Sequence, residues 1–356
     1  MSSSGEKKRI VMAVTNDLVT DRRVMRHAAA LREVGCEVML IGRNELGVKS
    51  RKGWRFYAEY NLRLWWHLLR TKCDMVWAND TDTLLASYVA ARMKRKKLVM
   101  DAHELFPEVP ELVGREKVKH VWETIERRLM PKCDALLTVC QSIADYYKEK
   151  YGVEMTVVRN LSGESYAVAS TAVSPLTSHL LPFTLLYQGC VNKGRGVDWA
   201  IDALEFLPDC RLVIAGGGDL LEEMRNYAAQ KPWANRIEFL GRLKPEELEL
   251  LTKQASVGLV MLEDMGLSYH FALPNRIGDF VAAGVPMVVS DLPEMAAVVN
   301  RFGIGSIMDG TGARSLAEAV KKVLSREWSD ADFVEARKDM DWNKEKEKLI
   351  EIIKTI

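Results

Sequence analysis

The stretch His270–Glu294, HFALPNRIGDFVAAGVPMVVSDLPE, constrains the fold more than any other part of the chain. Its apolar residues first recur at helical spacing; Pro274 is suited to open that helix, and Gly284 and Pro286 to end it. Met287–Val289 then reads as a strand that is apolar on both sides, as in a parallel sheet covered by helices. Helix, tight turn and buried strand in this order predict an α/β protein.

Polar residues in this stretch are candidates for ligand binding. Ser290 and Asp291 follow the predicted strand, and open α/β sheets bind ligands at the carboxyl ends of their strands. Asp279 lies within the predicted helix, one residue from its apolar face. A carboxylate there either accepts hydrogen bonds from sugar hydroxyls or is a solvated surface charge, and the pattern leaves both interpretations open.

The rest of the chain alternates strands and helices in two series, and a length of 356 residues favours two domains. Residues 162–182 separate the series with a Ser-rich, linker-like composition. The alternation predicts a parallel sheet in each half. The further strands are predicted at Arg9–Thr15, Glu37–Ile41, Asp74–Asn79, Leu98–Asp101, Ala135–Cys140, Met155–Val158, Phe183–Tyr187, Arg211–Ala215, Ile237–Leu240 and Val257–Leu262.

Charge is unevenly distributed although the net charge is only +1. Residues 1–165 carry 29 Lys and Arg against 22 Asp and Glu, and the remainder is acidic. The basic half suggests an anionic partner such as a phosphorylated acceptor or a membrane surface, with chance asymmetry as the alternative. The six cysteines lack metal-site spacing and indicate reduced thiols in a cytoplasmic protein.

The loop Gly189–Gly196, GCVNKGRG, joins a predicted strand to a helix. Its glycines let backbone N–H groups approach an oxyanion, and the following helix start adds positive potential. Lys193 and Arg195 add charge, and the Arg195 guanidinium suits bidentate binding of phosphate. This loop is therefore predicted to bind phosphate. The glycines Gly216–Gly218 after the next strand either admit a nucleotide or simply form a turn.

Two acidic loops follow strands of the first half. The predicted strand Leu98–Asp101 leads into the sequence DAHELFPE, which begins at Asp101. His103 therefore lies among carboxylates at a strand end, which favours a functional histidine. Asp80 and Asp82 form a D-x-D triplet before a predicted helix, where capping of the helix is the favoured role and no metal site is expected.

The segment Asn61–Lys72 is apolar and basic and contains the adjacent Trp65 and Trp66. One of these two tryptophans either packs inward or meets a membrane interface.

The His270–Glu294 stretch and the loops Gly189–Gly196 and Asp101–Pro107 together resemble motifs of retaining GT-B glycosyltransferases, glycosyltransferase family 4 in particular. The resemblance covers almost the whole chain. In the family, the central motif contains two acidic residues, the first of them a glutamate. The position of that glutamate corresponds to Phe271 in this chain, or to Tyr269 if the longer loop is counted, and neither residue is acidic.

This resemblance implies an α/β fold of the GT-B type, with two Rossmann-like parallel-sheet domains facing across a cleft. Residues 1–168 would form the acceptor domain and residues 169–339 the nucleotide-sugar domain. The terminal helix, about residues 340–356, would pack back on the first domain.

The resemblance also implies roles for individual residues. His103 would orient the donor sugar, and Lys193 and Arg195 would stabilise the diphosphate leaving group. The acceptor side would hold Asp21, Arg22 and Glu104, with Arg22 and Arg23 either pairing with phosphate or serving as ordinary charges at a helix start. The residues expected to bind the donor are Asp279, Asn275, Arg276, Gly189, Gly194, Arg242 and Gly217.

The leading hypothesis is a retaining, metal-independent glycosyltransferase that needs no cofactor and uses a nucleotide-diphosphate sugar as co-substrate. Its acceptor would be a glycan, a lipid-linked molecule or a small molecule, as in polysaccharide biosynthesis. We expect a cytoplasmic location, with peripheral contact at the inner face of the membrane as an alternative. We expect no nucleic-acid partner. The alternatives are a nucleotide-sugar epimerase on the same fold and a non-catalytic sugar-nucleotide-binding partner protein.

Overall fold

The computed structural model describes residues 7–16, 18, 21–50, 53–161 and 181–356. Their contacts divide the chain into two compact units. Unit 1 comprises the chain up to Asn160 together with Asn343–Ile356, and unit 2 comprises Leu161–Trp342. The predicted linker, residues 162–182, and the expected boundary at residue 168 fall almost entirely outside the described residues.

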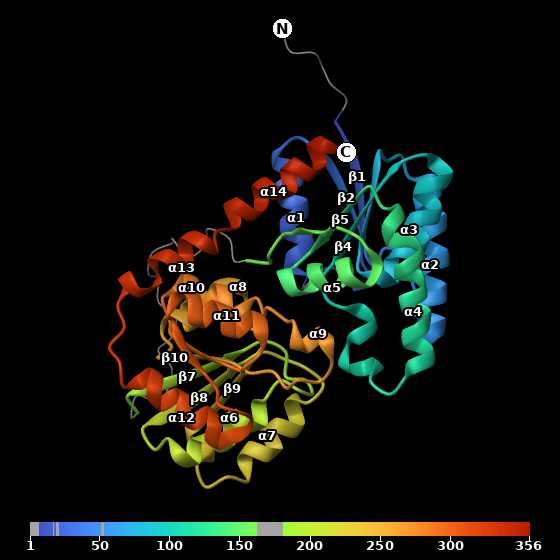
Figure 1. The fold of residues 1–356 in the computed structure, drawn as a ribbon. Helices are drawn as coiled ribbons and strands as arrows, with labels where there is room; N and C mark the ends of the chain where they lie inside the picture. The colour runs from blue at the N-terminus through green and yellow to red at the C-terminus, as the bar shows by residue number, and fades with distance from the viewer. Residues whose placement is uncertain (1–6, 17, 19–20, 51–52, 162–180) are drawn as a thin grey trace. The chain divides into compact units, whose positions relative to one another are not determined.

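Unit 1 is built on a six-stranded parallel sheet in the order β2-β1-β3-β4-β5-β6 (Figure 1). Its strands are β1 (Arg9–Ala13), β2 (Glu37–Ile41), β3 (Met75–Asn79), β4 (Lys97–Ala102), β5 (Ala135–Thr138) and β6 (Thr156–Val157). Its helices are α1 (Arg22–Glu33), α2 (Gly53–Arg70), α3 (Thr81–Lys94), α4 (Glu116–Leu129), α5 (Gln141–Tyr151) and α14 (Trp342–Thr355), with 3-10 turns at Phe106–Glu108, Pro110–Leu112 and Met130–Lys132.

Unit 2 repeats this architecture with a six-stranded parallel sheet in the order β12-β11-β10-β7-β8-β9. Its strands are β7 (Phe183–Gln188), β8 (Cys210–Ala215), β9 (Ile237–Gly241), β10 (Val257–Val260), β11 (Met287–Val289) and β12 (Gly305–Ile307). Its α-helices are α6 (Val197–Ala203), α7 (Leu221–Ala229), α8 (Pro245–Lys253), α9 (Leu267–His270), α10 (Arg276–Ala283), α11 (Pro293–Phe302), α12 (Gly312–Leu324) and α13 (Val334–Asp339).

The central stretch folds as predicted, with one shift. α10 begins at Arg276, two residues after the proline expected to open it. It ends at Ala283 and is capped by Gly284, whose φ of 72° is a left-handed conformation that favours glycine. Phe280 is fully buried on β10 because Gly258 leaves room for it: a Cβ at Gly258 would lie 2.6 Å from the ring. The predicted apolar strand is β11, in the interior of its sheet.

The helix α14 completes unit 1. Arg159 donates from its backbone N–H and its Nε to the buried carboxylate of Glu345, at 3.0 and 2.8 Å. The Nζ of Lys8 donates to the carbonyl of Ile353 at 2.9 Å, so the end of α14 contacts the segment that leads into β1. Among the described residues, no helix combines the length and apolarity needed to cross a bilayer.

Candidate functional site

The loops that follow β7, β8 and β9 converge at the carboxyl edge of the unit 2 sheet. The N–H of Gly189 donates to the carbonyl of Ala215 at 2.9 Å, and the N–H of Gly216 donates to that of Gly241 at 2.7 Å. A Cβ at Gly216 would lie 1.7 Å from the carbonyl oxygen of Gly189. Only glycine permits this approach, so the glycines after β8 have a packing role whatever else they do.

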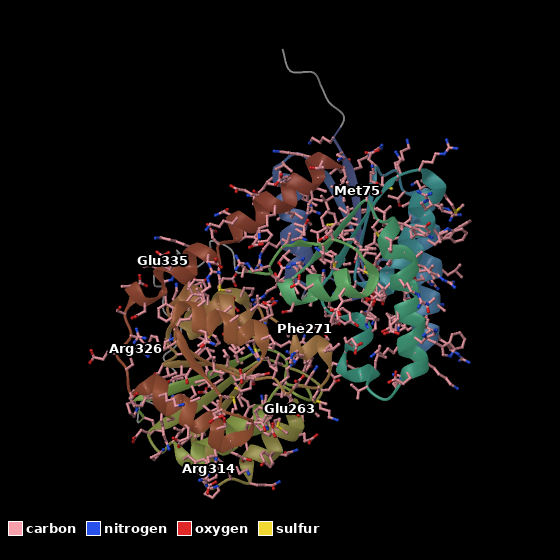
Figure 2. All side chains as sticks on the ribbon, in the orientation of Figure 1. Met75, Glu263, Phe271, Arg314, Arg326 and Glu335 are labelled. Carbon is pink, nitrogen blue, oxygen red and sulfur yellow. The ribbon has the colours of Figure 1, made fainter. Side chains whose placement is uncertain are left out.

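The loop Gly189–Gly196 is tied to the segment between β10 and α10, which includes the labelled Glu263 and Phe271 (Figure 2). The carbonyl of Gly194 accepts the N–H of Glu263 at 2.9 Å. A Cβ at Gly194 would lie 3.2 Å from the ring of Tyr269, on α9. The φ of 76° at Gly194 also favours glycine, so this loop conformation depends on the residue predicted there.

Arg195 is half-buried and lies over the ring of Tyr269, with its guanidinium carbon 4.8 Å from the ring centroid. Its Nε has no hydrogen-bond partner within the described part of the chain. Lys193, two residues earlier in the same loop, is exposed. The tyrosine therefore orients a guanidinium that retains hydrogen-bonding capacity, which suits binding of an anion.

Arg276 lies beneath the same loop and is nearly fully buried. It donates to the carbonyls of Gln188 and Met261 at 3.0 and 2.9 Å, and so joins the carboxyl ends of β7 and β10. Burial lowers the pKa of Arg276, and the nearby charge of Arg195 acts in the same direction. The side chain of Arg276 thus brings a second cation to this edge of the sheet.

Asp279 is buried and accepts a hydrogen bond from Nε2 of Gln188 at 2.9 Å. The Oε1 of Gln188 in turn accepts from the hydroxyl of Thr252 at 2.9 Å. The network links α10, β7 and α8. The interpretation of Asp279 as a solvated surface charge is therefore wrong.

The remaining predicted donor residues lie along the same edge. Asn275 precedes α10 and is exposed. Arg242 follows β9 and is exposed, with its Nε 2.9 Å from where a Cβ at Gly217 would be. At one edge of one sheet, unit 2 thus brings together Arg276, at the start of α10, and the loop residues Gly189, Gly194, Arg195, Gly217 and Arg242.

A second cluster lies at the carboxyl edge of the unit 1 sheet, around His103. Its Nδ1 is 3.4 Å from a carboxylate oxygen of Asp80, and its Nε2 is 3.4 Å from one of Asp101. The backbone N–H of His103 also donates to Asp80 at 2.7 Å. Burial alone would lower the pKa of His103, but the two carboxylates outweigh it and raise that pKa to about 9.

Asp101 is fully buried and anchors this cluster to α1. Arg23 donates to both of its carboxylate oxygens, at 2.9 and 2.5 Å, and Nδ1 of His27 lies 3.2 Å from it. Burial would raise the pKa of Asp101, yet Arg23 and His103 hold it well below the usual value. Because Arg23 is buried in this ion pair, the suggestion that it contacts substrate phosphate is wrong.

The D-x-D triplet does not cap α3 as expected. Asp80 occupies the N-cap position with a φ of 62°, but its side chain accepts no hydrogen bond from the helix. Asp82 is buried and accepts from the hydroxyl of Thr15 at 2.6 Å. Burial and the charge of Asp80 raise the pKa of Asp82 to about 8, so Asp82 is mostly protonated at neutral pH.

The residues predicted for the acceptor side lie at the start of α1 and in the loop after β4, both in unit 1. Asp21 caps α1: its carboxylate accepts from the N–H of Val24 at 3.0 Å and from Nδ2 of Asn16 at 2.6 Å. Arg22 is exposed in the first turn of α1. Glu104 follows His103 and is half-buried. The sequence placed His103 among carboxylates that include Asp101, but it assigned Asp80 to helix capping and so missed the contact of Asp80 with His103.

The titration of His103 provides a test of this cluster. A raised pKa means that its imidazolium stabilises the fold fully below about pH 6.5, and that this contribution is lost as pH rises toward about 9. NMR of the histidine ring is expected to show a midpoint near pH 9. Asp80→Asn should lower the midpoint by removing one carboxylate. A wild-type midpoint near pH 6.5 would contradict the arrangement.

Two protein-family models match the chain, one in each half. Residues 20–161 match the model described as Glycosyltransferase Family 4, and residues 178–347 match Glycosyl transferases group 1. An uncharacterized glycosyltransferase of Methanocaldococcus jannaschii is 26% identical over 163 residues, which are 44% of this chain. The match spans only 40% of that curated relative.

Solved structures share the whole fold. Anabaena HepE in complex with UDP-glucose has a TM-score of 0.75 and 14% identity, over 98% of this chain and 100% of that chain. Sucrose-phosphate synthase of Thermosynechococcus elongatus has a TM-score of 0.75 and 16% identity, over 98% and 99%. At these sequence identities, the similarity shows a common fold, which in this chain consists of two six-stranded parallel sheets.

Proposed function

We propose, because the chain belongs to the GT-B glycosyltransferases, that it transfers a sugar from a nucleotide-diphosphate sugar to a glycan, lipid-linked or small-molecule acceptor. The observation that carries the proposal is the cationic loop edge of unit 2. There Arg195 retains a donor without a protein partner among the described residues, and Arg276 adds a buried charge beneath the loop. HepE, which has a similar fold, binds UDP-glucose, in keeping with such a donor.

In the proposed reaction, the bond between the sugar anomeric carbon and the donor phosphate oxygen breaks, and a bond to the acceptor oxygen forms. Negative charge develops on the departing diphosphate, and Arg195 with Lys193 would stabilise it. The acceptor proton would pass to a donor phosphate oxygen, with the acceptor approaching on the leaving-group side. The product would then retain the anomeric configuration, and the reaction would need no metal.

His103 would position the donor sugar, and Asp279 the nucleotide ribose. With the two flanking carboxylates, His103 is mostly protonated at neutral pH and therefore donates hydrogen bonds without accepting them. A lipid-linked acceptor would require the protein to act at the surface of a membrane.

The test is a thermal-shift screen with UDP-glucose and other nucleotide sugars, followed by product analysis. A true donor stabilises the native state and raises the melting temperature in a concentration-dependent way. With an acceptor, NMR of the product should show a retained anomeric configuration, unchanged by EDTA. Epimerised donor without any acceptor would identify an epimerase instead. Binding without turnover would favour a non-catalytic partner protein, and no binding by any nucleotide sugar would refute the donor site.

A further inference from the structure

The outward faces of α2 and α3 carry apolar side chains where a helix on a protein surface normally carries polar ones. On α2 the exposed positions recur every four residues, and Trp54, Leu62 and Trp66 there are 75%, 65% and 54% exposed. On α3 the same spacing is occupied by Leu85, Val89 and Met93, which are 43%, 37% and 61% exposed. These six residues are called the outer stripe below.

The two halves of the outer stripe belong to one layer of helices. α2 packs against α3, and α3 packs against α4, along one face of the unit 1 sheet (Figure 1). Residues on the opposite sides of these helices, such as Leu64 and Leu84, are fully buried. The stripe therefore faces away from the core of unit 1, and side chains project outward from α2 in Figure 2.

The charges next to the outer stripe are positive. Arg70 stacks on the ring of Trp66, with its guanidinium carbon 3.2 Å from the centroid, and Arg55 lies 5.6 Å from the ring of Trp54. Arg92 is exposed on α3, and Arg95 is exposed just after it. An anionic surface would therefore be attracted to the rim of the stripe, and a cationic one repelled.

The acidic residues of α2 and α3 do not offset these charges. The two helices contain only Glu59 and Asp82. Glu59 accepts hydrogen bonds from the backbone N–H groups of Lys49 and Ser50 and from Nε of Arg63, and Asp82 is buried. The exposed charge of this face is thus cationic, which argues against a basic protein partner.

We infer that the outer stripe is a docking surface for a membrane that contains anionic lipids. Tryptophan favours the headgroup region, where its ring meets apolar chains and its N–H meets water. Aliphatic side chains would enter the acyl boundary, and the arginines would contact lipid phosphates, as in helices that lie in the membrane interface. The surface is formed by unit 1 alone, so the inference stands whether or not the proposed transfer reaction is correct.

Co-sedimentation of the full chain with vesicles tests the inference. Wild-type protein is expected to bind vesicles of phosphatidylcholine with phosphatidylglycerol, and to bind vesicles of phosphatidylcholine alone much more weakly. Leu62→Ser with Trp66→Ser should weaken binding at least tenfold. Arg70→Gln with Arg92→Gln should weaken it less at high salt than at low salt, because salt already screens those charges.

Met25→Ser is the matched control, since Met25 is 46% exposed on α1, a helix that lies apart from α2, α3 and α4 in Figure 1. It should bind like the wild type. Failure of the wild-type chain to bind anionic vesicles, or equal binding by the stripe variant, would overturn the inference. Sedimentation velocity without lipid is the third arm: a wild-type dimer that Leu62→Ser with Trp66→Ser makes monomeric would assign the stripe to a second copy of the chain instead.

Discussion

Alanine in place of Arg23 is expected to lower the free energy of unfolding by about 3–5 kcal/mol, because it removes one partner of a buried ion pair. Arg23 and Asp101 are 3% and 0% exposed, and the guanidinium holds both carboxylate oxygens. The same guanidinium donates to the carbonyl of Val158 at 2.6 Å, which would lose that donor as well. Burial and the charge of Arg23 lower the pKa of His27 to about 4, so in the wild type Arg23 is the residue of α1 that carries the charge facing Asp101 at neutral pH.

Urea unfolding of the full chain measures this effect, and Arg22→Ala is the matched control. Arg22 adjoins Arg23 on the same helix but is exposed, so its replacement should change stability by no more than about 0.5 kcal/mol. Arg23→Met combined with Asp101→Leu should recover much of the loss, because no uncompensated charge remains. If Arg23→Ala and Arg22→Ala proved equally mild, the ion pair would not hold α1 to the sheet.

Arg195→Ala is expected to reduce kcat/KM for the donor found in the screen by about 100- to 1000-fold, the usual effect of losing one group that stabilises developing charge. The proposed role needs a guanidinium directed at the diphosphate, and Tyr269 supports it from one side. Arg195→Lys should recover only part of the activity, since an ammonium lacks the planar pair of donors. Steady-state kinetics with both variants measures the difference.

Arg326→Ala serves as the control for this experiment. Arg326 also lies over an aromatic ring, 4.2 Å from the centroid of Trp328, but it follows the end of α12 and is separated from Glu263 in Figure 2. Its replacement should leave kcat/KM within about twofold of the wild type, as for a surface site away from the chemistry. An Arg195→Ala enzyme as active as Arg326→Ala would remove the phosphate role.

Most of the fold could be predicted from runs of apolar residues and from the glycines and prolines that end them. The strands Glu37–Ile41 and Met287–Val289 have the predicted bounds. Met287–Val289 is buried throughout, as expected of an inner strand in a parallel sheet, whereas Glu37–Ile41 is at the sheet edge and is partly exposed. β12 was not predicted: three residues, Gly305–Ile307, carry no pattern. The sequence likewise did not predict α11 or the part of α2 that precedes Asn61.

The site was less predictable, since side chains far apart in sequence determine it. The glycine loop and its cations are contiguous, and therefore visible as a motif. The setting of His103 depends on Asp101, which stands two residues earlier in β4, and on Asp80, which reaches it only because β3 and β4 are neighbours in the sheet. The burial of Arg23 depends on Asp101, 78 residues later. Spacing along the sequence does not reveal contacts between residues so far apart. A charged side chain such as that of Arg23 can therefore look like a surface residue in the sequence and be buried in the structure.

The attachment of α14 sets the order in which the molecule can be completed during synthesis. Unit 2 has all of its residues once Trp342 has been added, whereas unit 1 still lacks Asn343–Ile356. Until Asn343–Ile356 leaves the ribosome, Arg159 has no Glu345 to bind, and the surface that covers Leu349 is open to water. Of these two units, the one whose residues begin earlier in the chain is therefore the one completed second.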